Sequence, residues 1–192
     1  MLVGFHGYGE TAGTQLDRLR AIPGSEEWLV VSIQGLHRYY QRRTNEVVAS
    51  WMTRQDRELA IADNVAYVAS VVETVGREYA ATGTRVLAGF SQGVAMTFRA
   101  ATQAPRPVAG VIAVGGDVPP EISPPVLMRV TSMLLCRGTR DEWYTAGKFG
   151  EDAQRIREAG VDLRTMEFDG GHEWSQEVID AASSFLRERR HG

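Results

Sequence analysis

The sequence predicts an α/β protein in which about six mainly parallel strands are flanked by helices. Short apolar runs alternate along the chain with segments whose apolar residues recur every three or four positions, which is the pattern of amphipathic helices. Apolar strands that alternate with such helices build a parallel sheet that is covered on both faces. The length of 192 residues favours one domain, residues 1–192.

The elements can be assigned in chain order from these patterns. Strands are expected at residues 1–5, 28–33, 85–90, 108–114, 133–137 and 163–168. Helices are expected at 14–19, where Thr14 and Asp17 resemble a capping box, and at 54–79, from 91 onward, at 145–159 and at 175–187. Residues 34–53 show no clear period and are expected to form a long functional loop. The proline-rich bridge 118–125 is short, which predicts an open site without a helical lid.

Composition excludes several classes of function. The net charge of −3 offers no basic surface for nucleic acid or for an anionic membrane. We find no transmembrane stretch and no signal peptide, so we expect a cytoplasmic protein without membrane insertion. The single cysteine, Cys136, lies in an apolar run and is expected to be a buried small hydrophobe rather than a nucleophile.

The motif Gly-Phe-Ser-Gln-Gly at residues 89–93 lies between a predicted strand and a predicted helix. In that context a Gly-x-Ser-x-Gly sequence forms a tight turn that exposes the serine at its tip. We interpret Gly89 and Gly93 as positions where the reversal leaves no room for a side chain. Ser91 would then lie above the carboxyl edge of the sheet, at the start of a helix.

Other polar signals also follow strand ends, and ligands of such sheets bind beyond the carboxyl ends of the strands. His6 follows the first strand, Asp141 the fifth and His172 the sixth, while Ser91 follows the third. The chain order Ser, Asp, His is that of the α/β-hydrolase catalytic triad. Asp117, after the fourth strand, is an alternative acid.

With these residues the sequence resembles the phospholipase/carboxylesterase family of α/β hydrolases, which includes the acyl-protein thioesterases. The resemblance covers nearly the whole chain and is carried by residues 6–9 (HGYG), 50–51 (SW), 89–93 (GFSQG), 138–141 (GTRD) and 170–173 (GGHE). It implies a minimal, lidless α/β-hydrolase fold and favours Asp141 over Asp117 as the acid. Two segments depart from the family pattern: Met52-Thr53, where an acidic residue is usual, and residues 142–144, where small apolar residues and proline are usual.

We assign the chemical roles as follows. Ser91 is the expected nucleophile, and it needs a base within hydrogen-bonding distance. His172 can accept its proton near neutral pH and return it to the leaving group. Asp141 would hold the imidazole tautomer and stabilise the imidazolium. His6 is expected to shape the loop after the first strand rather than to act as a base.

The oxyanion hole and the substrate pocket complete the predicted site. The backbone N–H groups of Tyr8 and Gln92 are the expected donors to the developing negative charge. Three aromatic residues near strand ends or in the long loop, Trp51, Trp143 and Tyr144, are candidates for an apolar pocket. Core packing is an equally open interpretation for each of them.

These observations predict a serine carboxylesterase that cleaves small-molecule carboxylic esters, and thioesters as a further option, through an acyl-enzyme intermediate. The chemistry requires no cofactor and no metal. Two alternatives stay open. The chain could be a binding protein with a hydrolase fold and no turnover, or an amide or lactone hydrolase that uses the same triad.

Overall fold

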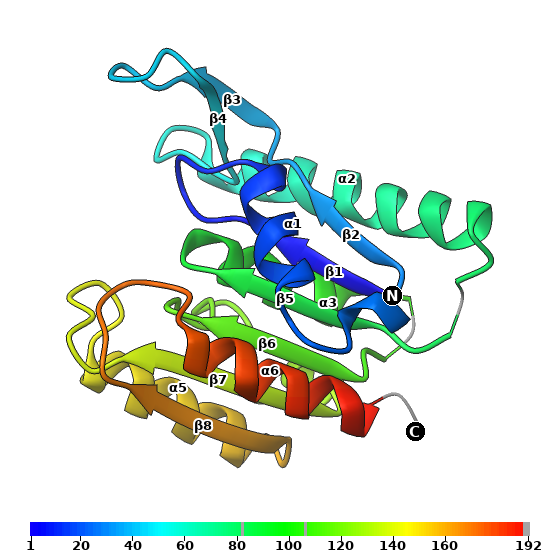
Figure 1. Cartoon of the computed structure of the whole chain (residues 1–192), viewed down its shortest axis with the longest axis vertical. Helices are drawn as coiled ribbons and strands as arrows, with labels where there is room; N and C mark the ends of the chain where they lie inside the picture. The colour runs from blue at the N-terminus through cyan, green and yellow to red at the C-terminus, as the bar shows by residue number, and fades with distance from the viewer. Residues whose placement is uncertain (82, 106, 190–192) are drawn as a thin grey trace.

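The computed structural model describes residues 1–81, 83–105 and 107–189, and a six-stranded sheet lies at its centre (Figure 1). The sheet contains β1 (Leu2–Phe5), β2 (Val30–Ile33), β5 (Val86–Phe90), β6 (Gly110–Val114), β7 (Ser132–Gly138) and β8 (Asp162–Phe168). Their order is β2-β1-β5-β6-β7-β8, and each neighbouring pair is parallel. The predicted parallel sheet is confirmed.

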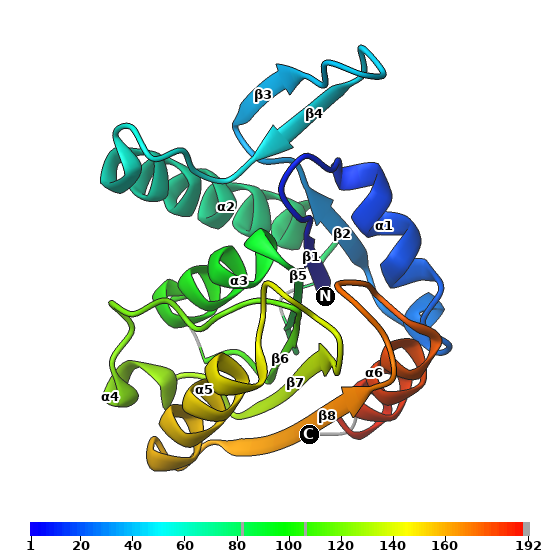
Figure 2. The same cartoon turned by 90° about the vertical axis from the view of Figure 1, so that its left-hand side faces the viewer.

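Helices cover both faces of this sheet, as Figure 2 shows. One face carries α1 (Ala12–Arg20) and α6 (Gln176–Arg189); the other carries α2 (Arg57–Glu78), α3 (Gln92–Gln103), α4 (Pro124–Leu127) and α5 (Ala146–Glu158). A short 3-10 helix spans Ser25–Glu27. Two clusters of buried side chains fill the layers, one built around Leu19 and Phe185 and the other around Phe98 and Ile156. The prediction of a sheet covered on both faces is therefore also confirmed.

The segment predicted as a long loop, residues 34–53, instead contains a β-hairpin. Its strands, β3 (His37–Tyr40) and β4 (Val47–Ser50), pair antiparallel and project from the body of the protein (Figures 1 and 2). The pattern was missed because the first strand, His37–Tyr40, contains no apolar run, and the short run Val47-Val48-Ala49 in the second strand was overlooked. β4 is anchored to the body by hydrogen bonds from Gly9 N–H to the Ala49 carbonyl and from Ala49 N–H to the Glu10 carbonyl.

The start of α1 also differs from the prediction. The cap is Thr11, whose hydroxyl accepts a hydrogen bond from the Thr14 N–H at 3.2 Å, so the helix begins one turn earlier than the Thr14–Asp17 pair indicated. Within the described part of the chain, α2 is the helix whose length and composition alone would suit a membrane span. Val65, Val68 and Val72 of this helix pack against the core, so its apolar face is used in folding.

The sheet order places the loop after β1 beside the turn after β5. β1 and β5 pair in a register that sets Phe5 opposite Gly89. The first turn of α3 then passes so close to β1 that a Cβ on Gly93 would lie 2.2 Å from the Phe5 carbonyl oxygen. A Cβ on Gly89 would lie 2.2 Å from the Thr97 hydroxyl oxygen. The structure thus supports the interpretation that both glycines make room for the reversal.

Replacing Gly93 tests this close packing. Gly93→Ala should lower the free energy of unfolding by about 2 kcal/mol or more, because the new methyl group overlaps backbone atoms that cannot move independently. The matched control is Gly150→Ala in α5, where an added Cβ meets no atom within 4 Å, and this change should stabilise the protein by about 1 kcal/mol. Urea unfolding measures both variants. An unchanged midpoint for Gly93→Ala would contradict the packing argument.

Candidate active site

Ser91 occupies the sharp turn between β5 and α3. Its backbone has φ 52° and ψ −121°, a left-handed conformation that costs a residue other than glycine about 1–3 kcal/mol. The turn is held by a hydrogen bond from Ser91 N–H to the Val114 carbonyl at 2.9 Å, and by Val94 N–H, which donates to the Ser91 carbonyl at 3.0 Å. This geometry directs the serine hydroxyl toward the carboxyl edge of the sheet.

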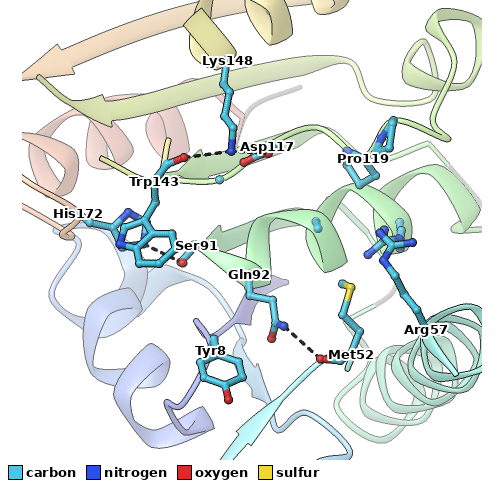
Figure 3. Close-up of a pocket in the computed structure, with 15 residues that line it drawn as sticks. Tyr8, Met52, Arg57, Ser91, Gln92, Asp117, Pro119, Trp143, Lys148 and His172 are labelled. Carbon is cyan, nitrogen blue, oxygen red and sulfur yellow. Dashed lines mark hydrogen bonds and ion pairs between the residues drawn. The ribbon is translucent and has the colours of Figure 1, made fainter. Parts of the chain in front are cut away.

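A chain of hydrogen bonds joins Ser91, His172 and Asp141, three of the residues predicted for the site. Figure 3 shows its Ser91–His172 part. Asp141 Oδ2 lies 2.7 Å from His172 Nδ1, and His172 Nε2 lies 2.8 Å from Ser91 Oγ. An ionised carboxylate can only accept a hydrogen bond, so His172 Nδ1 carries the proton and its N–H donates to Asp141. Nε2 is then free to accept the serine proton, which is the tautomer that a general base requires.

The Asp141 carboxylate is held in place from both sides. Its side chain is 1% exposed, and its second oxygen, Oδ1, accepts the N–H groups of Trp143 at 2.8 Å and Tyr144 at 2.9 Å. The histidine ring in turn packs against Phe90, with 5.0 Å between the ring centroids. These contacts orient the carboxylate toward the imidazole before any ligand binds.

Asp117, the alternative acid, lies elsewhere. Its carboxylate pairs with Lys148 at 3.3 Å and makes no hydrogen bond to His172 in the described part of the chain. Asp169, although close to His172 in sequence, pairs with Arg140 on the surface. The geometry therefore agrees with Asp141 as the partner of the histidine.

The predicted oxyanion donors lie on two neighbouring loops beside Ser91. The N–H groups of Gly7, Gly9 and Glu10 donate within the protein, whereas that of Tyr8 has no acceptor among the described residues. Gln92 is the first residue of α3, where a backbone N–H has no intrahelical acceptor. Both predicted donors are thus available to an oxyanion.

Glu10 was not found from the sequence, and it orders the loop that carries Tyr8. One carboxylate oxygen accepts the Gly7 N–H at 2.8 Å, and the two oxygens bind Arg18 at 2.6 and 2.7 Å. Burial alone would raise the pKa of Glu10, but the hydrogen bonds and charge of Arg18 outweigh it and hold the pKa below its ordinary value. The Arg18 guanidinium lies 4.3 Å above the Phe90 ring, on which His172 also packs.

His6 has a structural position, in line with its expected part in shaping the loop. It is buried, its Nδ1 lies 2.7 Å from the Gly7 carbonyl, and its Nε2 accepts the Gly35 N–H at 3.0 Å. Burial lowers the pKa of His6, which keeps the ring neutral between these two partners. Both nitrogens are occupied, so the ring cannot serve as a base.

A cavity of about 550 Å³ opens directly above Ser91. Its lining includes Tyr8, Met52, Arg57, Ser91, Gln92, Arg99, Asp117, Pro119, Trp143 and His172. Of the predicted pocket residues, Trp143 lies here with 75% of its surface exposed. Pro119, from the proline-rich bridge, forms part of the wall.

Two of the predicted pocket residues, Trp51 and Tyr144, belong to the core and do not line the cavity. The Trp51 ring packs against His6 and Phe5, and its indole N–H donates to the His6 carbonyl at 2.8 Å. The Tyr144 hydroxyl donates to Asp152 at 3.1 Å, and burial raises the pKa of Tyr144. Their position next to site residues in sequence did not reveal that their side chains turn inward.

Three cationic residues of the cavity were also missed, namely Arg57, Arg99 and Lys148. A signal for Arg99 was present, because Ser91, Ala95 and Arg99 are spaced by four and so share one face of α3, and all three line the cavity. Cys136 is fully buried, and burial raises its pKa to about 12, so its thiol is unreactive. Among the described residues, no group of three or more His, Cys, Asp or Glu side chains could hold a metal ion.

Comparison with known proteins gives a family and a fold. The model of the family described as Phospholipase/Carboxylesterase matches residues 1–189. Among curated proteins, no sequence matches the chain. The structure is similar to the Bacillus cereus carboxylesterase, with a TM-score of 0.77 and 15% identity over 98% of this chain and 88% of that one. It is also similar to Zea mays acyl-protein thioesterase 2, with a TM-score of 0.73 and 17% identity over 98% and 92% of the two chains.

A third similar structure is Arabidopsis thaliana SOBER1, with a TM-score of 0.76 and 18% identity over 98% of each chain. At these identities the likeness concerns the fold. The predicted α/β-hydrolase fold is confirmed.

The Glu10–Arg18 pair makes stability depend on pH. Glu10→Gln should lower the free energy of unfolding by about 1 kcal/mol at neutral pH, because the Gln side chain loses a charge-assisted hydrogen bond to Arg18. The folded-state pKa of Glu10 lies below its ordinary value of 4.5, so its contribution is complete above that pH and is lost as the pH falls through the folded pKa. The difference between wild type and variant should therefore shrink in acid.

Urea unfolding at neutral pH and at about pH 3.5 measures this difference. Glu151→Gln, an exposed position on α5, is the control and should change little at either pH. A wild-type-to-variant difference that is equally large at both pH values would contradict the assignment.

Proposed function

The chain belongs to the phospholipase/carboxylesterase family, and on that premise we propose that it is a serine esterase that cleaves carboxylic esters through an acyl-enzyme. The family and the similar structures support a hydrolase of the esterase or thioesterase type. The observation that carries the proposal is the unbroken hydrogen-bonded chain from Asp141 through His172 to Ser91, which ends at the floor of an open cavity.

Acylation follows from this geometry. Ser91 Oγ attacks the ester carbonyl carbon while His172 Nε2 takes the hydroxyl proton across their 2.8 Å contact. The imidazolium that forms is stabilised by the Asp141 carboxylate, which is already oriented by two backbone N–H groups. The carbonyl oxygen becomes an oxyanion, for which the N–H groups of Tyr8 and Gln92 are the proposed donors. Each such donor is typically worth about 3 kcal/mol of transition-state stabilisation.

The second half of the reaction uses the same groups in reverse. His172 Nε2 returns its proton to the leaving alcohol or thiol as the tetrahedral intermediate collapses to the Ser91 ester. Water then enters, and His172 takes a proton from it as it attacks the acyl carbon. Collapse releases the carboxylic acid and restores the Ser91 hydroxyl. The cycle consumes one water and needs no redox partner.

The openness of the cavity favours small esters in solution. Trp143 and Tyr8, which flank Ser91, are 75% and 64% exposed, so substrate can reach the serine without displacing a buried segment. We propose a small-molecule ester as the substrate, with thioesters as a second class because the same oxyanion forms from both. A cytoplasmic location stays a prediction.

Replacing the nucleophile tests the central assignment. Ser91→Ala should reduce kcat for p-nitrophenyl acetate by about 10⁴-fold or more, because no other group can form the acyl-enzyme. Ser70→Ala, an exposed serine on α2, is the matched control and should keep wild-type activity. A fluorophosphonate probe should label wild type at Ser91 and leave Ser91→Ala unlabelled. Folded wild-type protein that neither reacts nor turns over would favour the binding-protein alternative.

The two candidate acids can be separated by a pair of variants. Asp141→Asn should lower kcat by about 10⁴-fold, because an amide can present an N–H to His172 and favour the wrong tautomer. Asp117→Asn removes the carboxylate that pairs with Lys148 and should change kcat by less than about tenfold. Steady-state kinetics on the same ester compares them. A larger loss in Asp117→Asn than in Asp141→Asn would reverse the assignment of the acid.

A further inference from the structure

Four arginines line either the cavity above Ser91 or a neighbouring groove: Arg57 lines both spaces, Arg99 lines the cavity, and Arg38 and Arg54 line the groove. This group, which we call the arginine wall, comprises Arg38, Arg54, Arg57 and Arg99. Arg57 extends from the start of α2 toward Pro119, across the cavity from Trp143 and His172 (Figure 3). In a chain whose net charge is −3, such a local excess of cations requires an explanation.

The wall borders two connected spaces. Tyr8, Met52, Arg57 and Gln92 line both the cavity above Ser91 and a second groove of about 730 Å³ beneath the β3–β4 hairpin. The lining of that groove includes three arginines of the wall and no Asp or Glu among the described residues. A ligand seated at Ser91 can therefore continue into the groove and meet only cationic or neutral groups.

Most of these cations lack a counter-ion within the protein. Arg38, Arg54 and Arg57 are exposed and form no ion pair within the described ranges 1–81, 83–105 and 107–189. In the cavity above Ser91, Asp117 is the acidic residue of the lining, and it pairs with Lys148. No acidic residue of the lining therefore pairs with Arg57, which lies within electrostatic range of Glu121, the partner of Arg99 outside the lining.

Arg99 supplies an independent observation. Its side chain is 2% exposed, and Nε and Nη2 both donate to one oxygen of Glu121, at 2.9 and 2.6 Å. Its third nitrogen, Nη1, is buried and has no hydrogen-bond partner in the described part of the chain. A buried charged donor without a partner is costly, and Arg99 is one of the residues that line the cavity.

The start of α2, where Glu58 already supplies one negative charge in the first turn, is a further place where the helix dipole favours an anion. Arg57 is the first residue of this 22-residue helix, where the helix dipole disfavours a cation. The N-cap residue, Asp56, makes no side-chain hydrogen bond to the first turn. Arg57 and Arg99 also repel each other: burial lowers the pKa of Arg99, and the neighbouring charge of Arg57 lowers it further.

We propose that the ester substrate carries an anionic group, a carboxylate or a phosphate, and that the arginine wall binds it while Ser91 attacks the ester carbonyl. This inference deepens the proposed function and depends on it. A guanidinium binds either anion through two parallel N–H donors, which makes arginine the side chain suited to such recognition. The anion lies on the acyl half or on the alcohol or thiol half of the substrate, and the experiment distinguishes the two.

Two matched substrate pairs provide the test. For the acyl half, the p-nitrophenyl monoester of glutaric acid is compared with p-nitrophenyl pentanoate, which has the same chain length and no charge. For the leaving group, S-butyryl coenzyme A is compared with S-butyryl-N-acetylcysteamine, its neutral counterpart. In one of the pairs, kcat/KM should be higher for the charged member by about tenfold or more, since a charge-assisted hydrogen bond contributes that much.

Variants test whether the arginine wall causes the preference for the charged substrate. Arg57→Gln should lower the ratio of charged to neutral kcat/KM by about tenfold in the preferred pair. Arg77→Gln, which removes an exposed arginine from the last turn of the same helix, is the control and should keep the wild-type ratio. Raising NaCl from about 20 mM to 500 mM should lower the wild-type ratio, because salt screens exposed charges. Ratios near one in both pairs, or a preference that survives Arg57→Gln, would overturn the proposal.

A binding measurement separates this proposal from the catalytic one. Ser91→Ala is titrated calorimetrically with glutarate and with coenzyme A, so that no turnover is required. The preferred anion should bind, and its Kd should weaken by about tenfold in the double variant Ser91→Ala/Arg57→Gln. If neither anion binds, the arginine wall is not a ligand site, even where the neutral esters are hydrolysed. If an anion binds but no ester is cleaved, the arginine wall is supported as a ligand site and the proposed esterase activity is contradicted.

Discussion

The site depends on one close approach of backbone to backbone, where the first turn of α3 passes the end of β1. Only glycine at position 93 permits it, since a Cβ there would lie 2.2 Å from the Phe5 carbonyl oxygen and 2.6 Å from that of His6. The contact brings the loop after β1 against the turn that carries Ser91. Parallel pairing of β1 with β5 sets the two strand ends level, and the glycine closes the remaining gap. The two proposed oxyanion donors can converge only because these backbones meet.

Trp51 links this backbone contact to other elements around the cavity. Its indole N–H binds the His6 carbonyl, its backbone N–H binds the Gln92 side chain at 2.9 Å, and its carbonyl accepts from Asn64 of α2 at 2.9 Å. One buried residue thus connects β4, the loop after β1 and two helices through its side chain and its backbone. The residue predicted as a candidate for the substrate pocket instead holds residues that line the cavity. Gln92 has a second use, because its side chain fixes residue 51 while its backbone N–H is a proposed oxyanion donor.

The sequence predicted the sheet and the three hydrogen-bonded residues well for a physical reason. Both follow from local patterns, namely apolar runs and polar residues at strand ends, and a parallel sheet collects those ends at one edge. The direction in which a side chain points does not follow from local sequence patterns in the same way. Whether Trp51 or Tyr144 turns toward the cavity or the core is decided by packing between elements distant in sequence. The β3–β4 hairpin was missed because β3 contains no apolar run and the short run Val47-Val48-Ala49, of which the last two residues are buried, was overlooked. Arg99 was missed because the faces of α3 were not assigned from the sequence.

The two halves of the cavity handle charge in opposite ways, and the contrast has a physical meaning. At the proposed reaction centre, the Asp141 carboxylate accepts two backbone N–H groups and the imidazole N–H, so its charge is compensated before substrate arrives. At the other wall, Arg57 has no ion pair in the described residues, and Arg99 keeps a buried N–H without an acceptor. Preorganisation speeds a reaction when the fixed dipoles match the transition state. A buried N–H without an acceptor instead costs the free protein stability, and the exposed guanidinium of Arg57 is free to pair with an anionic ligand. On this proposal, the chemistry at Ser91 and the choice of substrate depend on different residues.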